Sequence, residues 1–302
     1  MQLLLLGGSG FVSGTLARLA IQQGHMVWAV SRGQKILIPG VHPILADRND
    51  AAALHDALTA AGVTFDACLD CICYTPEQAA IDLTVLPTFT QRLVVISTDS
   101  VYHPFHKTVP QTEEAAFYMD DDGYGCKKRL MEQTFEASCS PIRWTIFRPG
   151  HIFGPGSQVG AYPEHCRQPD LLRRMRNDEP LHLVDGGSFL LHPIYAEDLT
   201  AAMLACIPLP ACENQIFCIG GPEIVTNADY FTLLGELIGH PAVIETVPLE
   251  GYLEAHPQYS GHLCHRAYSL QKLENAGVPL PHTSLRDGLL EQIRWLDAHQ
   301  AP

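Results

Sequence analysis

The sequence predicts an α/β fold, with a doubly wound parallel sheet in the first half of the chain and a smaller lobe in the second half. Short apolar runs alternate with helix-forming stretches from the first residue, and this alternation becomes irregular after about Gly150. Continuous apolar runs are typical of strands buried on both faces, and their alternation with helices indicates parallel pairing.

Six strands are expected in the first 155 residues. The clearest is residues 3–6, where four leucines in a row leave no polar face, and the others are residues 26–30, 43–46, 65–73, 92–97 and 144–147. Helices are expected between them at residues 12–20, at residues 50–61 and from residue 76. They are predicted by apolar residues at helical spacing, by a run of alanines and by a proline suited to a first turn.

The second half is expected to form the smaller lobe and to return in part to the sheet. Helices are predicted at residues 171–177, 198–207, 226–238 and 284–299, and a strand at residues 216–219. Thr226 and Asp229 have the spacing of a capping box at the start of the third of these helices. We therefore assign residues 1–155 to the sheet, with 192–220 returning to it, and residues 156–191 and 221–302 to the lobe.

The composition indicates a compact folded protein without polyanionic partners. Apolar residues make up 46% and charged residues 17% of the 302 residues, which fits a packed core. The net charge of −14 repels nucleic acid and anionic membranes at long range, so we expect neither as a partner. The apolar run at residues 3–6 is too short for a signal peptide, and we expect a cytoplasmic protein.

Ten cysteines favour free thiols in a reducing compartment over a disulfide framework. Cys68 and Cys71 form a C-x-x-C pair, but no second pair follows at the spacing of zinc ligands. His262, Cys264 and His265 are a second candidate zinc cluster, although isolated groups of this kind are usually structural. We expect no metal site.

The first strand is joined to the first helix by a glycine-rich loop, Gly7-Gly8-Ser9-Gly10-Phe11-Val12-Ser13-Gly14. Glycines let the backbone approach a pyrophosphate closely, and the helix N-terminus supplies N–H donors and a favourable dipole. A structural tight turn is the alternative. The position directly after a buried strand favours a dinucleotide site.

The loop resembles the G-x-x-G-F-x-G pattern of the extended short-chain dehydrogenase/reductases, the NAD-dependent epimerase/dehydratase family. Gly7, Gly10 and Phe11 match, whereas Ser13 replaces the last glycine and Gly14 follows it. Because serine is small, we expect looser helix–strand packing and an intact site. The resemblance implies a Rossmann-type sheet, an NAD(P) cofactor and a C-terminal lobe that binds the substrate.

The end of the second strand bears on the choice between NAD and NADP. Enzymes that prefer NAD usually place an acid there to hold the ribose hydroxyls. Here Ser31 and Arg32 follow the strand, and Arg32 is available to a 2′-phosphate unless it is only a solvent-facing arginine. We expect NADP or NAD, with NADP favoured. By the resemblance, Asp47 contacts the adenine, and Asp70 and Cys71 lie beside the cofactor path.

Two further motifs carry the expected chemistry. Residues 97–102 resemble the family's S-[ST]-x-x-V-Y segment, which implies that Thr98 is the catalytic hydroxyl. Tyr124 and Lys128 match its Y-x-x-x-K motif and share one helix face. A nearby ammonium and an oxidised nicotinamide favour the phenolate, so Tyr124 would take or give a proton while hydride moves. An exposed tyrosine beside a helical cation is the alternative.

The resemblance continues through residues 148–156, similar to the family's R-P-x-x-x-x-G-P segment, and residues 192–198, similar to its I-H-V-x-D segment. The expected catalytic residues are Thr98, Tyr124 and Lys128, and the expected substrate contacts are Thr98, Asp99, Ser100 and His151. The expected cofactor contacts are Gly7, Gly8, Ser9, Gly10, Phe11, Val12, Ser31, Arg32, Asp47, Arg48, Asp70, Cys71, Ser97, Tyr124, Lys128, Pro149 and Gly150.

Epimerisation, dehydration and carbonyl reduction or alcohol oxidation all fit these parts. Ser100 stands where the family's sugar 4,6-dehydratases have glutamate, which disfavours dehydration. Nucleotide sugars are the family's usual substrates, but residues 187–191 lack the arginine that often grips their pyrophosphate. Residues 173–176 contain three arginines that either replace it or belong to a solvated helix face: Arg173, Arg174 and Arg176. A free sugar, a sugar acid or another small hydroxy or keto compound stays open.

We predict an NAD(P)-dependent epimerase or oxidoreductase that acts by reversible hydride transfer on a secondary alcohol or ketone of a sugar or nucleotide-sugar-like substrate. A non-catalytic NAD(P)-binding sensor or scaffold is the rival hypothesis, and the presence of Tyr124 and Lys128 argues against it. An RNA-binding relative is disfavoured by the net charge of −14. The family also leads us to expect a homodimer.

Overall fold

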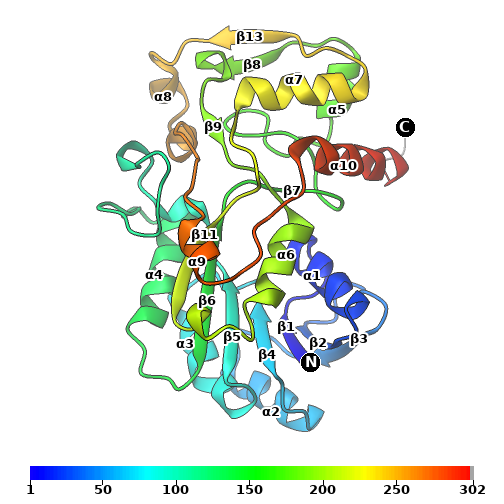
Figure 1. Cartoon of the computed structure of the whole chain (residues 1–302), viewed down its shortest axis with the longest axis vertical. Coiled ribbons are helices and arrows are strands. Elements are labelled where there is room, and N and C mark those ends of the chain that lie inside the picture. The colour runs from blue at the N-terminus through cyan, green and yellow to red at the C-terminus, as the bar shows by residue number, and fades with distance from the viewer. Residues whose placement is uncertain (300–302) are drawn as a thin grey trace.

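The computed structural model describes residues 1–299, without the side chains of Gln258 and Ser260. A parallel sheet of seven strands occupies the lower half of the molecule in Figure 1, in the order β11-β6-β5-β4-β1-β2-β3. Its strands are Gln2–Leu6 (β1), Met26–Ser31 (β2), Val41–Leu45 (β3), Ala67–Asp70 (β4), Arg92–Ile96 (β5), Arg143–Pro149 (β6) and Gln215–Ile219 (β11). The predicted fold class is confirmed.

Helices cover both faces of the sheet, because alternate residues of each buried strand point to opposite sides. In β1, Leu3 and Leu5 pack with one helical layer, and Leu4 and Leu6 pack with the other. The first layer contains Phe11–Gln22 (α1) and Ala196–Ala205 (α6), and the second contains Ala51–Ala61 (α2), Pro76–Val85 (α3) and Tyr124–Glu136 (α4). The four consecutive leucines therefore fill two separate cores.

Local signals decide where several helices begin. Asp50 accepts a hydrogen bond from a backbone amide in the first turn of α2, and Thr75 caps α3, whose first residue is Pro76. Thr226 and Asp229 form the predicted capping box. Each of these caps uses contacts within four residues along the chain, which is why the sequence alone predicts it.

The second lobe forms the upper half of Figure 1. Its helices include Leu171–Arg176 (α5), Asn227–Ile238 (α7), Tyr252–Ala255 (α8) and Leu285–His299 (α10). Three short strand pairs accompany them: Leu181–Val184 (β8) with Ile244–Val247 (β13), Leu190–Leu191 (β9) with Val225–Thr226 (β12), and Ile152–Phe153 (β7) with Ile194–Tyr195 (β10). Apolar residues of α5, α7 and α10 share a core of their own.

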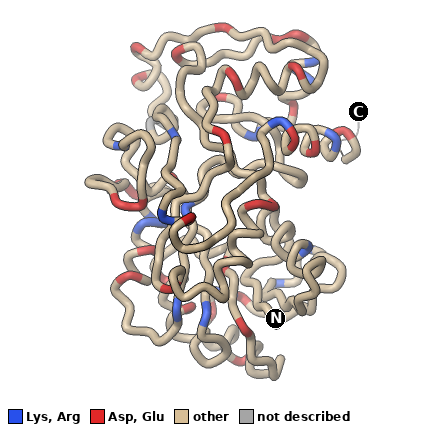
Figure 2. The backbone as a smooth tube through the Cα atoms, viewed as in Figure 1, with Lys and Arg blue, Asp and Glu red and all other residues tan. Residues whose placement is uncertain are grey.

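Between α8 and α10 the chain returns to the sheet. Gln271–Asn275 (α9) packs against β11 and places Leu273 in a core of the sheet. Acidic residues are spread over both lobes (Figure 2). Within residues 1–299, no helix combines the length and the apolar character needed to cross a bilayer.

Some observed boundaries differ from the expected ones. β4 ends at Asp70 rather than at residue 73, because pairing with β1 and β5 stops there and Asp70 accepts a hydrogen bond from the Ile72 amide. β6 is longer than expected, since it pairs with both β5 and β11. α6 begins two residues before Asp198, whose carboxylate instead accepts hydrogen bonds from the amides of His282 and Thr283.

A buried ion pair joins α4 to the carboxyl ends of β5 and β6. Glu132 accepts hydrogen bonds from the Arg148 guanidinium at 2.9 and 2.6 Å and from the Ser97 hydroxyl at 2.6 Å. All three residues are buried. Glu132 lies one turn after Lys128, so this pair fixes against the sheet the helix that carries both Tyr124 and Lys128.

Glu132→Gln leaves the Arg148 guanidinium buried without a counter-charge. We expect the free energy of unfolding to fall by about 3–5 kcal/mol. The double variant Glu132→Leu/Arg148→Met removes both buried charges and should be more stable than the single variant. Urea denaturation followed by circular dichroism measures both, and a double variant less stable than Glu132→Gln contradicts this account.

Gly125 lets α4 pack directly on the turn after β5. A Cβ at this position would lie 2.0 Å from the carbonyl oxygen of Ser100, which is backbone and has little room to move. We expect Gly125→Ala to lower the free energy of unfolding by about 1–3 kcal/mol. Lys127→Ala, at an exposed position of the same helix, should change it by no more than about 0.5 kcal/mol. Equal losses of unfolding free energy in the two variants would contradict the interpretation that Gly125 allows this close packing.

Candidate active site

Two adjoining cavities lie beyond the carboxyl ends of the strands, where the strand order reverses between β1 and β4. One has a volume of about 400 Å³ and contains Tyr124, and we call it the tyrosine cavity. The other has a volume of about 380 Å³, borders the glycine loop and is called the glycine-loop cavity. Gly10, Ser13, Ile72 and Tyr74 line both, so the two cavities form one crevice.

Glycines shape the loop between β1 and α1. Gly7 and Gly8 have φ angles of 98° and 145°, and a Cβ on Gly8 would lie 2.8 Å from the Ala29 side chain. The sequence led us to expect looser helix–strand packing at Ser13, but the structure shows a tightly held side chain there. Ser13 is buried, and its hydroxyl accepts hydrogen bonds from the amides of Gly8 and Gly10 at 3.1 and 3.0 Å. The serine therefore holds the loop against the helix.

Nearly all predicted cofactor contacts line the crevice. The glycine-loop cavity is lined by Gly7, Gly8, Ser9, Gly10, Ser31, Arg32, Asp47 and Arg48. The tyrosine cavity is lined by Phe11, Val12, Cys71, Ser97, Tyr124, Lys128, Pro149 and Gly150. Asp70 is fully buried and lines neither cavity. Lys35 adds a cation to the glycine-loop cavity that sequence reasoning missed.

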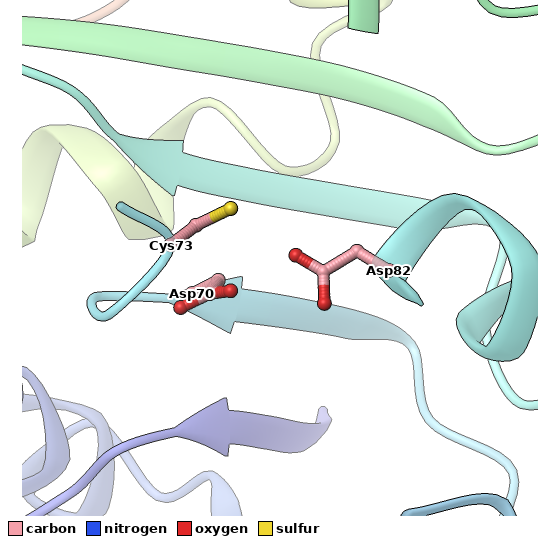
Figure 3. Close-up of side chains that lie close together, drawn as sticks. All are labelled: Asp70, Cys73 and Asp82. Atoms are coloured by element: carbon pink, nitrogen blue, oxygen red, sulfur yellow. The ribbon is translucent and has the colours of Figure 1, made fainter. Parts of the chain in front are cut away.

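Arg48 and Asp70 belong to a buried ion cluster behind the glycine-loop cavity. The Nη2 atom of Arg48 donates to Asp70 at 2.5 Å and to Asp82 at 2.7 Å. Figure 3 shows Asp70 at the end of β4, Cys73 just after it and Asp82 on α3, close together. Ligand atoms of these three residues lie within 4.8 Å of one another, as in a metal site. The guanidinium, however, already supplies the cation, and burial together with Asp70 raises the pKa of Asp82.

Tyr124 and Lys128 face the tyrosine cavity from the first turns of α4. Tyr124 is 52% exposed, whereas Lys128 is buried. The Nζ atom of Lys128 donates to the carbonyl oxygens of Cys73 and Ile96, both at 2.7 Å, and lies 6.0 Å from the centre of the Tyr124 ring. The same ammonium lies 4.7 Å from the centre of the Tyr74 ring. The two motif residues are thus brought together as predicted.

Electrostatics set the protonation of this pair. Burial lowers the pKa of Lys128 to about 8, so its amine is mostly charged at neutral pH. Burial and the nearby Tyr74 raise the pKa of Tyr124 to about 12, against the effect of a hydrogen bond with Thr98. In the protein without cofactor, Tyr124 is therefore a neutral phenol that can donate a proton.

The turn after β5 supplies the hydroxyl beside this phenol. Thr98 accepts a hydrogen bond from the Ser100 amide at 3.2 Å and donates one to Asp99 at 3.4 Å. Asp99 also accepts hydrogen bonds from Arg266 at 2.5 Å and from the Tyr268 hydroxyl at 2.6 Å. Burial favours the neutral acid, but Arg266 and other neighbours outweigh it and keep the pKa of Asp99 below its ordinary value.

The second lobe closes the tyrosine cavity with His262, which the sequence suggested only as a zinc ligand, and with four residues that sequence reasoning did not identify: Tyr162, Arg167, Leu191 and Arg266. The rings of Tyr162 and His262 stack, with centres 3.7 Å apart and planes inclined by 13°. His151, a predicted substrate contact, also lines the cavity, and burial together with Arg167 and Arg266 lowers its pKa to about 3. No local motif marks these positions, since only the folding of the lobe over the sheet brings them here.

Two other groups considered from the sequence take other roles. His262 stacks on Tyr162, Cys264 accepts a hydrogen bond from Lys107, and His265 accepts one from the Leu190 amide, so the three do not converge. The three arginines of α5 lie outside both cavity linings and form ion pairs with carboxylates of Asp170, Glu179 and Asp297. They are therefore part of the lobe's surface.

The chain is similar to known proteins in sequence and in fold. The model of the NAD dependent epimerase/dehydratase family matches residues 78–220. The chain is 24% identical over 240 residues to the chloroplast stem-loop binding protein of 41 kDa b of Arabidopsis thaliana, which covers 74% of this chain and 60% of that protein. It is 25% identical over 293 residues to 2-alkyl-3-oxoalkanoate reductase of Stenotrophomonas maltophilia, which covers 90% of this chain and 85% of that protein.

Solved structures share the fold over nearly the whole chain. UDP-glucose 4-epimerase of Thermotoga maritima superposes with a TM-score of 0.79 and 19% identity, covering 99% of each chain. The dTDP-glucose 4,6-dehydratase of Bacillus anthracis, solved with NAD, has a TM-score of 0.76 and 18% identity, covering 99% of this chain and 97% of that one. These likenesses bear on the fold, and over residues 78–220, a little less than half of the chain, the sequence is similar to the NAD dependent epimerase/dehydratase family.

Proposed function

We propose that this protein is an NAD(P)-dependent epimerase or oxidoreductase that transfers hydride reversibly at a secondary alcohol or ketone of a sugar or nucleotide-sugar-like substrate. One observation carries the proposal: the phenol of Tyr124 and the ammonium of Lys128 face a cavity that adjoins the glycine loop. An acid/base group beside a dinucleotide site is what hydride transfer to or from a carbonyl carbon requires.

The crevice fits a dinucleotide. Gly8 has no room for a Cβ beside Ala29, so the loop keeps a bare backbone at this point, and the first amides of α1 have no partner within the helix. Arg32 and Lys35 line the glycine-loop cavity, where they would meet a 2′-phosphate, and Asp47 lies there for the adenine. A bound nicotinamide supplies the hydride donor or acceptor, and Pro149 and Gly150 would border it.

The three N–H donors of Lys128 have different partners. Two are used by the carbonyl oxygens of Cys73 and Ile96, which leaves the third for a ribose hydroxyl of the cofactor. Its charge also favours the phenolate of Tyr124. Tyr124 then takes the proton from a substrate hydroxyl or returns it to a carbonyl oxygen, while Thr98 hydrogen-bonds the reacting oxygen.

The substrate class follows from the cavity and from the relatives together. The relatives named above include a reductase and a UDP-glucose 4-epimerase, so both activities are represented. Arg167 and Arg266 both line the tyrosine cavity, and because Arg266 is already paired with Asp99, Arg167 is the arginine that suits an anionic group. Ser100 lacks a carboxyl group to take part in dehydration, which leaves epimerisation and oxidoreduction.

A non-catalytic dinucleotide-binding protein is the second candidate, because one relative is named as a stem-loop binding protein. The intact Tyr124–Lys128 pair favours catalysis, and the net charge of −14 disfavours a nucleic-acid partner. The homodimer and the cytoplasmic location stay predictions from the sequence.

Tyr124→Phe removes the proton donor and keeps the ring. We expect turnover to fall by about 10²–10⁴-fold, while the dissociation constants of NADH and NADPH change by about twofold at most, because phenylalanine keeps the ring that contacts the cofactor and loses only the acid/base hydroxyl. The assays are interconversion of UDP-glucose and UDP-galactose, and oxidation of NAD(P)H by a panel of keto sugars and keto acids. Tyr118→Phe, outside the cavity lining, is the control. Full turnover in Tyr124→Phe would falsify the assignment.

Arg32→Gln tests the preference for NADP. Losing a charge-assisted hydrogen bond to the 2′-phosphate should weaken NADPH binding roughly tenfold or more and leave NADH binding unchanged. Fluorescence titration measures both, with the exposed Arg18→Gln as control. Equal binding of NADH and NADPH by the wild-type protein would contradict the preference for NADP. It would leave the proposed hydride transfer unaffected.

A further inference from the structure

Ser13 lies on the wall that the two cavities share. The other residues of that wall are Gly10, Ile72 and Tyr74. These shared residues mark the place where the two cavities meet. A dinucleotide that fills both cavities passes this place, and the group that joins its two nucleosides there is the pyrophosphate. Gly10 has no side chain and Ile72 is apolar, so Ser13 and Tyr74 carry the polar side chains at the crossing.

The hydrogen bonds of Ser13 leave one donor unused. A serine hydroxyl has two lone pairs and one proton. The amides of Gly8 and Gly10 donate to its oxygen at 3.1 and 3.0 Å, which engages both lone pairs. Within residues 1–299, no group accepts a hydrogen bond from this hydroxyl. Thr15 on the same helix differs, because its hydroxyl donates to the Phe11 carbonyl oxygen at 3.0 Å.

The surroundings make this donor rigid. Ser13 is 4% exposed and stands at the third position of α1, close to the helix end that favours negative charge. The two amide donors fix its oxygen and polarise the O–H bond, which strengthens the bond that its proton can form. Ser13 lines both cavities, so a ligand that occupies them comes within reach of this hydroxyl.

We propose that the Ser13 hydroxyl donates a hydrogen bond to the pyrophosphate of the bound dinucleotide. The proposal rests on the NAD(P) binding proposed above. Where the family pattern has a glycine that serves close packing, this chain has a side chain that binds phosphate. A hydrogen bond from a fixed donor to a charged acceptor is among the stronger ones in proteins, so the contact should be visible in affinity.

The alternative is that Ser13 only holds the glycine loop in shape. The two roles predict that loss of the hydroxyl weakens the binding of different ligands. A distorted loop weakens every ligand of the glycine-loop cavity, including adenosine, which has no phosphate. A lost phosphate contact weakens ADP and spares adenosine.

The experiment compares ADP with adenosine by isothermal titration calorimetry on wild type, Ser13→Ala, Ser13→Gly and Thr15→Val. The ratio of the dissociation constant of adenosine to that of ADP measures what the phosphates contribute. We expect this ratio to fall roughly tenfold in both Ser13 variants and to stay unchanged in Thr15→Val. Thermal melts by circular dichroism check that each variant is folded, and Ser13→Gly provides the reading where Ser13→Ala does not fold.

An unchanged ratio in the Ser13 variants overturns the proposal. So does an equal weakening of ADP and adenosine, which assigns Ser13 to loop shape alone, and so does tighter ADP binding by Ser13→Gly. A wild-type protein that binds ADP but neither NADH nor NADPH contradicts the proposed function, while the two ADP and adenosine constants still decide the role of Ser13.

Discussion

The buried ammonium of Lys128 is the interaction on which the rest of the crevice depends. Its Nζ atom donates to the carbonyl oxygens of Cys73, in the loop after β4, and of Ile96, the last residue of β5. A buried charge is costly unless hydrogen bonds satisfy it, so these two bonds have to form when α4 packs on the sheet. One side chain therefore ties together three segments that are distant in sequence, and it sets the position of Tyr124 one turn away.

Two buried ion pairs constrain the elements that carry this ammonium and line its cavity. Glu132, one turn after Lys128, pairs with Arg148, and Asp99, in the turn after β5, pairs with Arg266. Such pairs add little net stability, but a shift that separated them would leave an unpaired charge in the interior. We interpret them as constraints on geometry. They hold α4 and the turn after β5 in one arrangement, and Arg266 carries that constraint into the second lobe.

Sequence reasoning predicted those parts of the candidate site that depend on contacts close in the chain. Gly7, Gly8 and Gly10 were recognisable because a strand–loop–helix connection needs them within a few residues. Tyr124 and Lys128 were recognisable because a spacing of four puts two side chains on one helix face. Both sets line the crevice as expected. Ser13 was noticed as a departure from the pattern, but its bonds to two loop amides were not foreseen.

By itself the sequence determined the order of strands and helices, the two-sided burial of the strands and the residues of the local motifs, because hydrophobic periodicity and helix caps act within a few residues. The tertiary structure decided which charged side chains form ion pairs with one another. Arg48 and Asp70 follow strands that adjoin the site, yet they bind each other and Asp82 in the interior. Tyr162, Arg167 and Arg266 carry no motif, and they reach the tyrosine cavity only because the second lobe packs over the sheet. Contacts between residues more than a hundred positions apart depend on the packing of the whole chain, which no local pattern specifies.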